Sequence, residues 1–156
     1  KRPPLRTLST AIAARAIVTY VSLFKKQENQ HFFSTCKQID MLMLNHTKTC
    51  LLYLQSYQEK NLNAVAELFA EQIILRDWNL RVVGKAAALN ETQKNFEAAQ
   101  SLHIEVLHTY ENTKSVAAEL IITVNNSEIL HVIDVLDFDA QGKIVAIRAY
   151  RGRGDE

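Results

Sequence analysis

The feature that most constrains the fold is a series of β-type segments in the C-terminal half of the chain. Four runs rich in β-branched and aromatic residues follow one another, at residues 102–110, 115–124, 128–138 and 143–151. Each break between them is three or four residues long and carries Asn, Asp, Ser or Gly, which favour turns. Connections this short join antiparallel neighbours. The pattern therefore predicts an antiparallel meander, with Gly142 at the positive φ of its last turn.

Helical segments precede this meander. Apolar residues recur at helical spacing, Asn61 and Asn63 are suitable helix caps, and Gly84 precedes a run rich in Ala, Leu, Glu and Gln. We expect helices at residues 42–60, 64–69 and 85–100, and one short strand at residues 73–78. Helices followed by antiparallel strands are typical of an α+β fold, in which the helices cover one face of a curved sheet.

Length and composition favour a single globular domain. The chain has 156 residues, of which 47% are hydrophobic and 22% are charged, and its net charge is +1. We place the domain at residues 41–152 and a short tail at 153–156. Because the net charge gives no overall attraction for polyanions, we expect no nucleic-acid partner.

The first 40 residues differ from the rest, since they are basic and contain no acidic residue before Glu28. Their apolar run, residues 16–24, is shorter than the roughly 20 residues that span a bilayer, so we expect no membrane partner. We interpret residues 1–40 as a basic leader that is a peripheral helix or is not native to the protein. Cys36 and Cys50 have no disulfide or redox spacing, which favours a cytoplasmic location.

One carboxylate stands out in the segment 128–138. Alternate residues of a strand project to the same side, so Asp134 lies in an apolar row. The row consists of Leu130, Val132, Leu136 and Phe138. An unpaired carboxyl there costs several kcal/mol unless it is bonded or protonated. Asp134 is therefore predicted either to serve a pocket or to form a structural hydrogen bond, with Tyr53 or a neighbouring helix.

The opposite side of the same segment is also largely apolar, because Ile133 and Val135 project there. A strand that is apolar on both faces requires a cover on the second face as well. We expect a homodimer formed through the sheet.

Three stretches carry a resemblance to a known family. Residues 53–70 resemble the opening helices of ketosteroid isomerases, residues 75–87 their first strand and third-helix entry, and residues 133–152 their closing hairpin. The chain thus resembles the nuclear transport factor 2-like, ketosteroid isomerase-like superfamily, which includes polyketide cyclase-like proteins. The resemblance implies a cystatin-like curved antiparallel sheet wrapped around three N-terminal helices, a cone with an apolar pocket. This fold hosts isomerases, cyclases, epoxide hydrolases and non-catalytic binding proteins.

The resemblance also implies catalytic positions. The family's tyrosine position falls on Tyr53, its base position on Asp77 and its acid position on Asp134. The tyrosine and the protonated acid would donate hydrogen bonds to a substrate oxygen, while the base moves a proton. An acid in this role must have a raised pKa, as in ketosteroid isomerase itself.

Two departures concern the pocket: Trp78 stands where the family commonly has proline, and the family's supporting aromatic falls near Thr92. We expect the pocket to bind a small apolar ligand that contains a carbonyl. Its predicted walls are Trp78, Tyr57, Phe96, Leu130, Val132 and Leu136. The five histidines are scattered without a metal-binding motif, so neither a metal nor another cofactor is expected.

The leading hypothesis is therefore cofactor-independent proton transfer beside a carbonyl, by an isomerase or a cyclase. The alternative is a non-catalytic module that binds a ligand or a protein on the same fold. Epoxide hydrolysis needs an arginine between two carboxylates, and the nearest candidate, Arg76, alternates to the side opposite Asp77.

Overall fold

The computed structural model describes residues 45–154. The predicted leader, residues 1–40, and the first four residues of the predicted domain lie outside the described residues. The helices are α2 (His46–Gln58), α3 (Leu62–Leu68) and α4 (Lys85–Ala98). The strands are β1 (Phe69–Arg76), β2 (Arg81–Val83), β3 (Leu102–Glu111), β4 (Ser115–Val124), β5 (Glu128–Phe138) and β6 (Ile144–Arg151).

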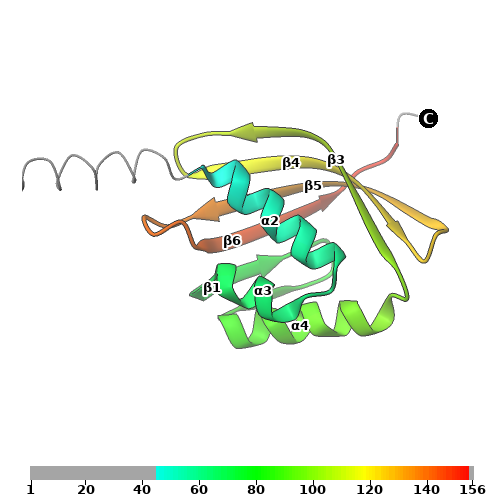
Figure 1. Cartoon of the computed structure of the whole chain (residues 1–156), viewed down its shortest axis with the longest axis horizontal. Coiled ribbons are helices and arrows are strands. Elements are labelled where there is room, and N and C mark those ends of the chain that lie inside the picture. Colours follow the sequence, from blue (N-terminus) through cyan, green and yellow to red (C-terminus); the bar gives the residue numbers. More distant parts are fainter. Residues whose placement is uncertain (1–44, 155–156) are drawn as a thin grey trace, which may run out of the picture. The chain divides into compact units, whose positions relative to one another are not determined.

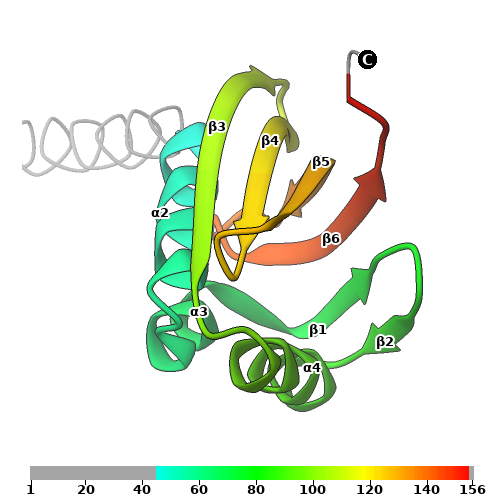
Figure 2. The ribbon, with the colours of Figure 1, turned by 90° about the vertical axis from the view of Figure 1, so that its right-hand side faces the viewer.

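The six strands form one sheet in the order β2-β1-β6-β5-β4-β3. Figure 1 shows the long strands β3 to β6 side by side, and Figure 2 shows the sheet curving from β3 round to β2. Helix α2 contacts β3 and β4 at one end of this curve, and α4 contacts β1 and β2 at the other. The predicted α+β fold, with three helices and a curved sheet, is confirmed.

Two details of the sheet differ from the prediction. The strand expected at residues 73–78 begins earlier, at Phe69, and a short strand, β2, follows it. Strand β1 also pairs in parallel with β6, with Leu75 opposite Ile147, so the sheet is mixed. These two strands are far apart in the sequence, and no short connection forces them to run antiparallel.

Short polar contacts explain where the helices begin. The Asn45 side chain accepts a hydrogen bond from the Lys48 N–H at 2.8 Å, and Asn61 accepts from the Ala64 N–H at 3.1 Å, so each asparagine caps a helix. Glu111, the last residue of β3, accepts from the His46 N–H at 3.0 Å. The β5–β6 turn has Gly142 at φ 77°, as predicted.

The packed core fills the space between α2 and one end of the inner face of the sheet. Alternate residues of β4 and β5 are buried there, and Leu136 and Ile144 are inaccessible to solvent. Cys50 of α2 is part of this core, and burial raises the pKa of its thiol to about 12. The thiol is therefore a structural group. None of the described helices is long and apolar enough to cross a membrane.

Candidate functional site

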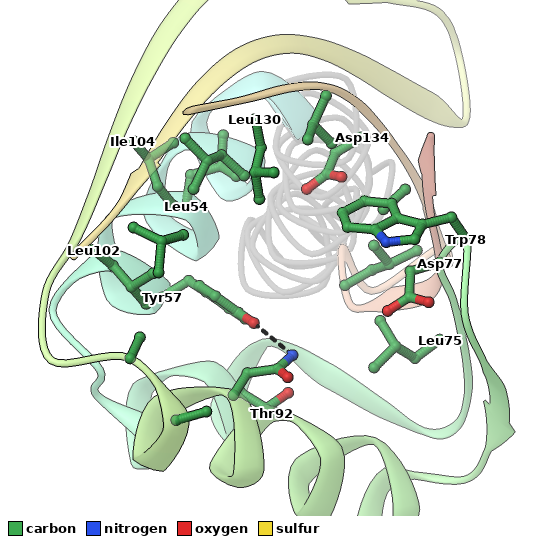
Figure 3. A pocket seen from close by; sticks show the side chains of 18 of the residues that line it. Leu54, Tyr57, Leu75, Asp77, Trp78, Thr92, Leu102, Ile104, Leu130 and Asp134 are labelled. Carbon is green, nitrogen blue, oxygen red and sulfur yellow. Dashed lines mark hydrogen bonds between the residues drawn. The ribbon is translucent and has the colours of Figure 1, made fainter. Parts of the chain in front are cut away.

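The other end of the inner face is hollow. A cavity of about 420 Å³ lies between α2, α4, the β1–β2 turn and the sheet (Figure 3). Its walls are largely apolar and include Leu54, Leu75, Leu102, Ile104, Ile122, Leu130, Val132 and Ile147. Such a hollow, with few polar groups, is typical of a small-molecule site.

Asp134 of β5 is the buried polar group of this hollow. Its neighbours across the strands are Ala118 of β4 and Ala149 of β6, and it is 8% exposed. The carboxyl points into the cavity (Figure 3). Burial raises its pKa to about 7, because an apolar environment disfavours the charged form. No hydrogen bond joins the carboxyl to another of the residues 45–154, so within this part of the chain the structural bond considered for it, to Tyr53 or a helix, is not formed.

Two tyrosines of α2 line the same cavity, and their rings lie 5.8 Å apart between centroids. Tyr53 is 5% exposed. Burial, with the nearby Asp134 as a smaller cause, holds the pKa of its hydroxyl well above the ordinary value. Tyr57 accepts a hydrogen bond on its hydroxyl oxygen from Asn95 Nδ2 of α4, at 3.0 Å. Both hydroxyls therefore remain protonated and are available to donate near neutral pH.

Asp77 lies where β1 ends, and it has a structural role in the turn that leads to β2. Its Oδ1 accepts hydrogen bonds from the N–H groups of Asn79 at 2.6 Å and Leu80 at 2.8 Å. The same side chain lines the cavity, across from Tyr57 (Figure 3). The two backbone donors fix the direction of the carboxylate, and its second oxygen, Oδ2, takes no part in either bond.

Trp78 lies beside Asp77 and forms part of the cavity wall, although 43% of the residue is exposed. The guanidinium of Arg151 lies 6.0 Å from the centre of the indole ring, a distance at which a cation and an aromatic ring attract. Arg151 also lies 3.8 Å from a carboxylate oxygen of Glu128. The open side of the cavity thus has an aromatic side chain where the family commonly has proline.

The family is decided by a match over most of the described residues. The model of the SnoaL-like domain matches residues 52–147. The chain belongs to the SnoaL-like family. No curated protein matches the sequence.

Solved structures show the same fold as this SnoaL-like chain. A protein from Kribbella flavida assigned as a ketosteroid isomerase is 18% identical, with a TM-score of 0.62 over 71% of this chain and 80% of that one. The epoxide hydrolase/cyclase-like enzyme SalBIII, which has a role in pyran ring formation in salinomycin, is 23% identical, with a TM-score of 0.61 over 70% and 92%. A protein from Sinorhizobium meliloti assigned as a polyketide cyclase is 16% identical, with a TM-score of 0.60 over 65% and 93%. At these identities the likeness shows the fold alone.

The structure of the SnoaL-like chain brings most of the predicted site residues to one cavity. Those that line it are Tyr53, Tyr57, Asp77, Trp78, Leu130, Val132 and Asp134. Phe96 and Leu136 do not line it. The ring of Phe96 packs edge-on against that of Tyr57 at 4.9 Å, and Leu136 lies in the packed core. Phe96 therefore supports the wall from behind, whereas Leu136 lies on the same inward row of β5 beyond the end of the cavity.

Several lining residues were not predicted. Ile104 and Ala149 line the cavity, and the alternation of β3 and β6 would have indicated them. Asn95 has no such signal, because its role depends on a side-chain contact between α4 and Tyr57 of α2. At the position of the family's supporting aromatic, the Thr92 hydroxyl donates to the Ala88 carbonyl at 2.9 Å.

The charged residues of the lining are all acidic. Within residues 45–154, the carboxylates of Asp77, Asp134 and Glu128 line the cavity, and no lysine, arginine or histidine does. Arg76, the candidate considered for epoxide hydrolysis, is exposed and lies outside the lining. The same residues contain no group of three or more His, Cys, Asp or Glu that could hold a metal ion.

Proposed function

We propose that this SnoaL-like chain is a cytoplasmic small-molecule pocket protein of the ketosteroid isomerase-like type. It moves a proton beside the carbonyl of an apolar ligand without a cofactor, as an isomerase or a cyclase. The observation that carries the proposal is Asp134. Its carboxyl is buried, has a pKa raised to about 7 and opens, without a hydrogen-bond donor among the described residues, into an apolar cavity that Tyr53 and Asp77 also line.

The three polar groups divide the work of proton transfer. Removing a proton beside a carbonyl builds negative charge on the oxygen, and Tyr53 and protonated Asp134 would stabilise that charge by donating hydrogen bonds in a site with little water. Asp77 would take the proton with Oδ2 and return it to another carbon. Its Oδ1 is oriented by the Asn79 and Leu80 N–H groups, so the base is positioned before the ligand binds.

The substitution Asp77→Asn tests the base. The asparagine oxygen still accepts the two backbone bonds of the turn, but the amide has no basic oxygen for the substrate proton. Isomerisation of a β,γ-unsaturated cyclic ketone to the conjugated enone, followed by ultraviolet absorbance, should slow by about 10³-fold. Binding of 2-naphthol, an aromatic mimic of the enol, should stay unchanged. Unchanged turnover would remove the base assignment.

A non-catalytic binding module is the second candidate, and one observation favours it. The hydrogen bonds from Asn79 and Leu80 give Asp77 a structural reason to be present that is independent of catalysis. A protein that binds 2-naphthol but isomerises none of a series of β,γ-unsaturated ketones would be assigned to this class. Epoxide hydrolysis has the least support, because the cavity lining among the described residues contains no arginine.

Dimerisation through the sheet is part of the proposal. Ile129 and Ile133 on the outer face of β5 are 58% and 39% exposed, and Tyr150 of β6, opposite Ile133, is 49% exposed. A second copy of the chain would cover this apolar face. Sedimentation velocity of the full chain should give the mass of a dimer, and Ile133→Lys should give a monomer. A wild-type monomer at 100 µM, well above ordinary dimer dissociation constants of about 1 µM, would contradict the proposal.

A further inference from the structure

The cavity contains a second polar pair, Tyr57 and Asn95, which the proposed reaction does not use. Tyr57 comes from α2 and Asn95 from α4, and the Asn95 Nδ2 donates to the Tyr57 hydroxyl at 3.0 Å. Figure 3 shows the Tyr57 hydroxyl on the helical side of the cavity, whereas Asp134 and Asp77 face it from the sheet side and from the β1–β2 turn. The Tyr57 hydroxyl therefore lies across the cavity from the two aspartates.

Hydrogen-bond counting shows what this pair offers a ligand. A tyrosine hydroxyl has one proton to donate and accepts through its oxygen. The Asn95 N–H already fills the accepting role, so the proton of Tyr57 is directed elsewhere. Burial also raises the pKa of the Tyr57 hydroxyl, although the Asn95 bond works against this rise. Tyr57 is thus a protonated donor whose direction Asn95 sets.

Two other polar side chains of the lining, Thr92 and Asn125, form hydrogen bonds within the protein. Thr92 donates to the Ala88 carbonyl at 2.9 Å, and Asn125 Oδ1 accepts from the Gln100 N–H at 2.7 Å. The amide oxygen of Asn95 forms no hydrogen bond within residues 45–154, and its amide nitrogen holds the Tyr57 hydroxyl. The pair therefore offers a ligand oxygen one directed donor, the Tyr57 hydroxyl.

We propose that Tyr57 and Asn95 form a second oxygen-binding subsite, which holds a hydroxyl or carbonyl at the far end of the ligand. The substrate class is then an apolar ring compound with two oxygens, one at Asp134 and the other at Tyr57. The inference rests on the proposed function for the first oxygen only. Tyr57 touches the ligand, and Asn95 is a positioning residue that acts through Tyr57.

Two matched probes test the subsite by calorimetry on the full chain: 2-naphthol, with one oxygen, and 2,6-dihydroxynaphthalene, with an oxygen at each end. The symmetric diol gains twofold from its two equivalent orientations alone. One further hydrogen bond gives about fivefold more, so the wild-type protein should bind the diol about tenfold more tightly. A wild-type ratio near two would overturn the subsite and leave the proposed function standing.

Three variants show which residues cause the diol to bind more tightly than 2-naphthol. Tyr57→Phe should reduce it to about two, because the donor is lost. Asn95→Asp is the sharper variant: a carboxylate at this exposed position only accepts, so it captures the Tyr57 proton and should also reduce the ratio to about two. Tyr53→Phe is the matched control, which should weaken both probes alike and keep the ratio near ten.

The outcomes separate this inference from the proposed function. An unchanged ratio in Asn95→Asp would overturn the positioning role of Asn95, and an unchanged ratio in Tyr57→Phe would overturn the subsite. Failure of both probes to bind the wild-type protein would overturn the subsite and the small-molecule pocket together. If Asp77→Asn loses ketone isomerisation but still binds the diol about tenfold more tightly than 2-naphthol, both the subsite and the proposed function are supported.

Discussion

Each face of β5 carries an aspartate, and the two aspartates lie in opposite environments. Asp134 on the inner face is buried beside the cavity, and burial raises its pKa to about 7. Asp137, three residues further on the outer face, accepts two hydrogen bonds from Arg148, at 2.5 and 2.8 Å, and this pairing lowers its pKa. The outer aspartate stabilises the fold when charged, whereas the inner one opposes folding when charged. A buried group that costs stability without a structural partner marks a candidate site.

The inner face of β5 is itself divided. Around Leu130, Val132 and Asp134 the sheet borders the cavity, whereas Leu136 and Phe138 lie in the packed core with Ile144. The boundary falls at Asp134, between Ala118 and Ala149. Only Ala149 of these two alanines lines the cavity. The carboxyl therefore rests on packed side chains on one side and faces open volume on the other.

The largest expected effect is on the pH dependence of stability, measured with Asp134→Asn. The folded pKa of about 7 lies above the unfolded value of about 3.9. The stability that the protonated group contributes is therefore fully present below pH 4 and is lost as the pH rises through 7. Relative to the variant, the wild-type protein should lose about 4 kcal/mol between pH 4 and pH 8 in urea unfolding. Parallel pH curves for the two proteins would contradict the inner-face assignment.

The next effect compares two aliphatic residues of β5 by truncation. Leu136→Ala leaves a cavity in the packed inner row and should lower the free energy of unfolding by about 3 kcal/mol. Ile133→Ala, on the outer face where 39% of the residue is exposed, should cost less than about 1 kcal/mol at concentrations where the chain is a monomer. Urea unfolding at several protein concentrations measures both. Equal costs would show that the outer face is packed as tightly as the inner one.

Enlarging the two alanines beside Asp134 tests where the hollow begins. Ala118→Leu adds volume to a position with no exposed surface and should cost about 2 kcal/mol. Ala149→Leu extends into the cavity, so it should change stability by less than about 0.5 kcal/mol and abolish binding of 2-naphthol. Thermal unfolding and calorimetry measure the two effects. Tight naphthol binding by Ala149→Leu would place the ligand elsewhere.

The smallest effect concerns Asp137→Asn on the outer face. Its pairing with Arg148 is partly exposed, so its loss should cost about 1 kcal/mol at neutral pH. The sign of the pH dependence is opposite to that of Asp134. The pKa of Asp137 is lowered in the folded state, so its contribution is present above the unfolded pKa and disappears as the pH falls through the lower, folded one. Urea unfolding at pH 2 and pH 7 should show the difference between variant and wild type only at pH 7.

Local patterns were sufficient to predict most of the fold. The bounds of β4 and β5 agree with the prediction because alternation and turn residues both mark them, and Gly142 has the expected positive φ. Phe69 was expected at the end of a helix but begins β1, where it pairs with Ile144. That pairing joins distant parts of the chain, so local sequence patterns could not predict it.

The residues of the candidate site also fall into those that local patterns predicted and those that depend on tertiary contacts. Strand alternation correctly placed Leu130, Val132 and Asp134 on one inward row, and the resemblance placed Tyr53 and Asp77, both of which line the cavity. Periodicity places Leu136 on the same inward row but does not show where along the row the cavity ends, so Leu136 was predicted for the pocket but lies in the core. The Tyr57–Asn95 contact depends on how two helices meet, which no local pattern encodes.

One titration tests the protonation of Asp134 most directly. Carbon NMR of the full chain, labelled at the aspartate carboxyls, follows each group separately, and Asp134→Asn identifies the signal of interest. The structure predicts that Asp134 titrates with a midpoint near 7, while the signal of Asp137 titrates below its usual range. A midpoint for Asp134 near 4, the value of a solvated aspartate, would show a charged carboxylate in the cavity at neutral pH and would contradict the proposed donor.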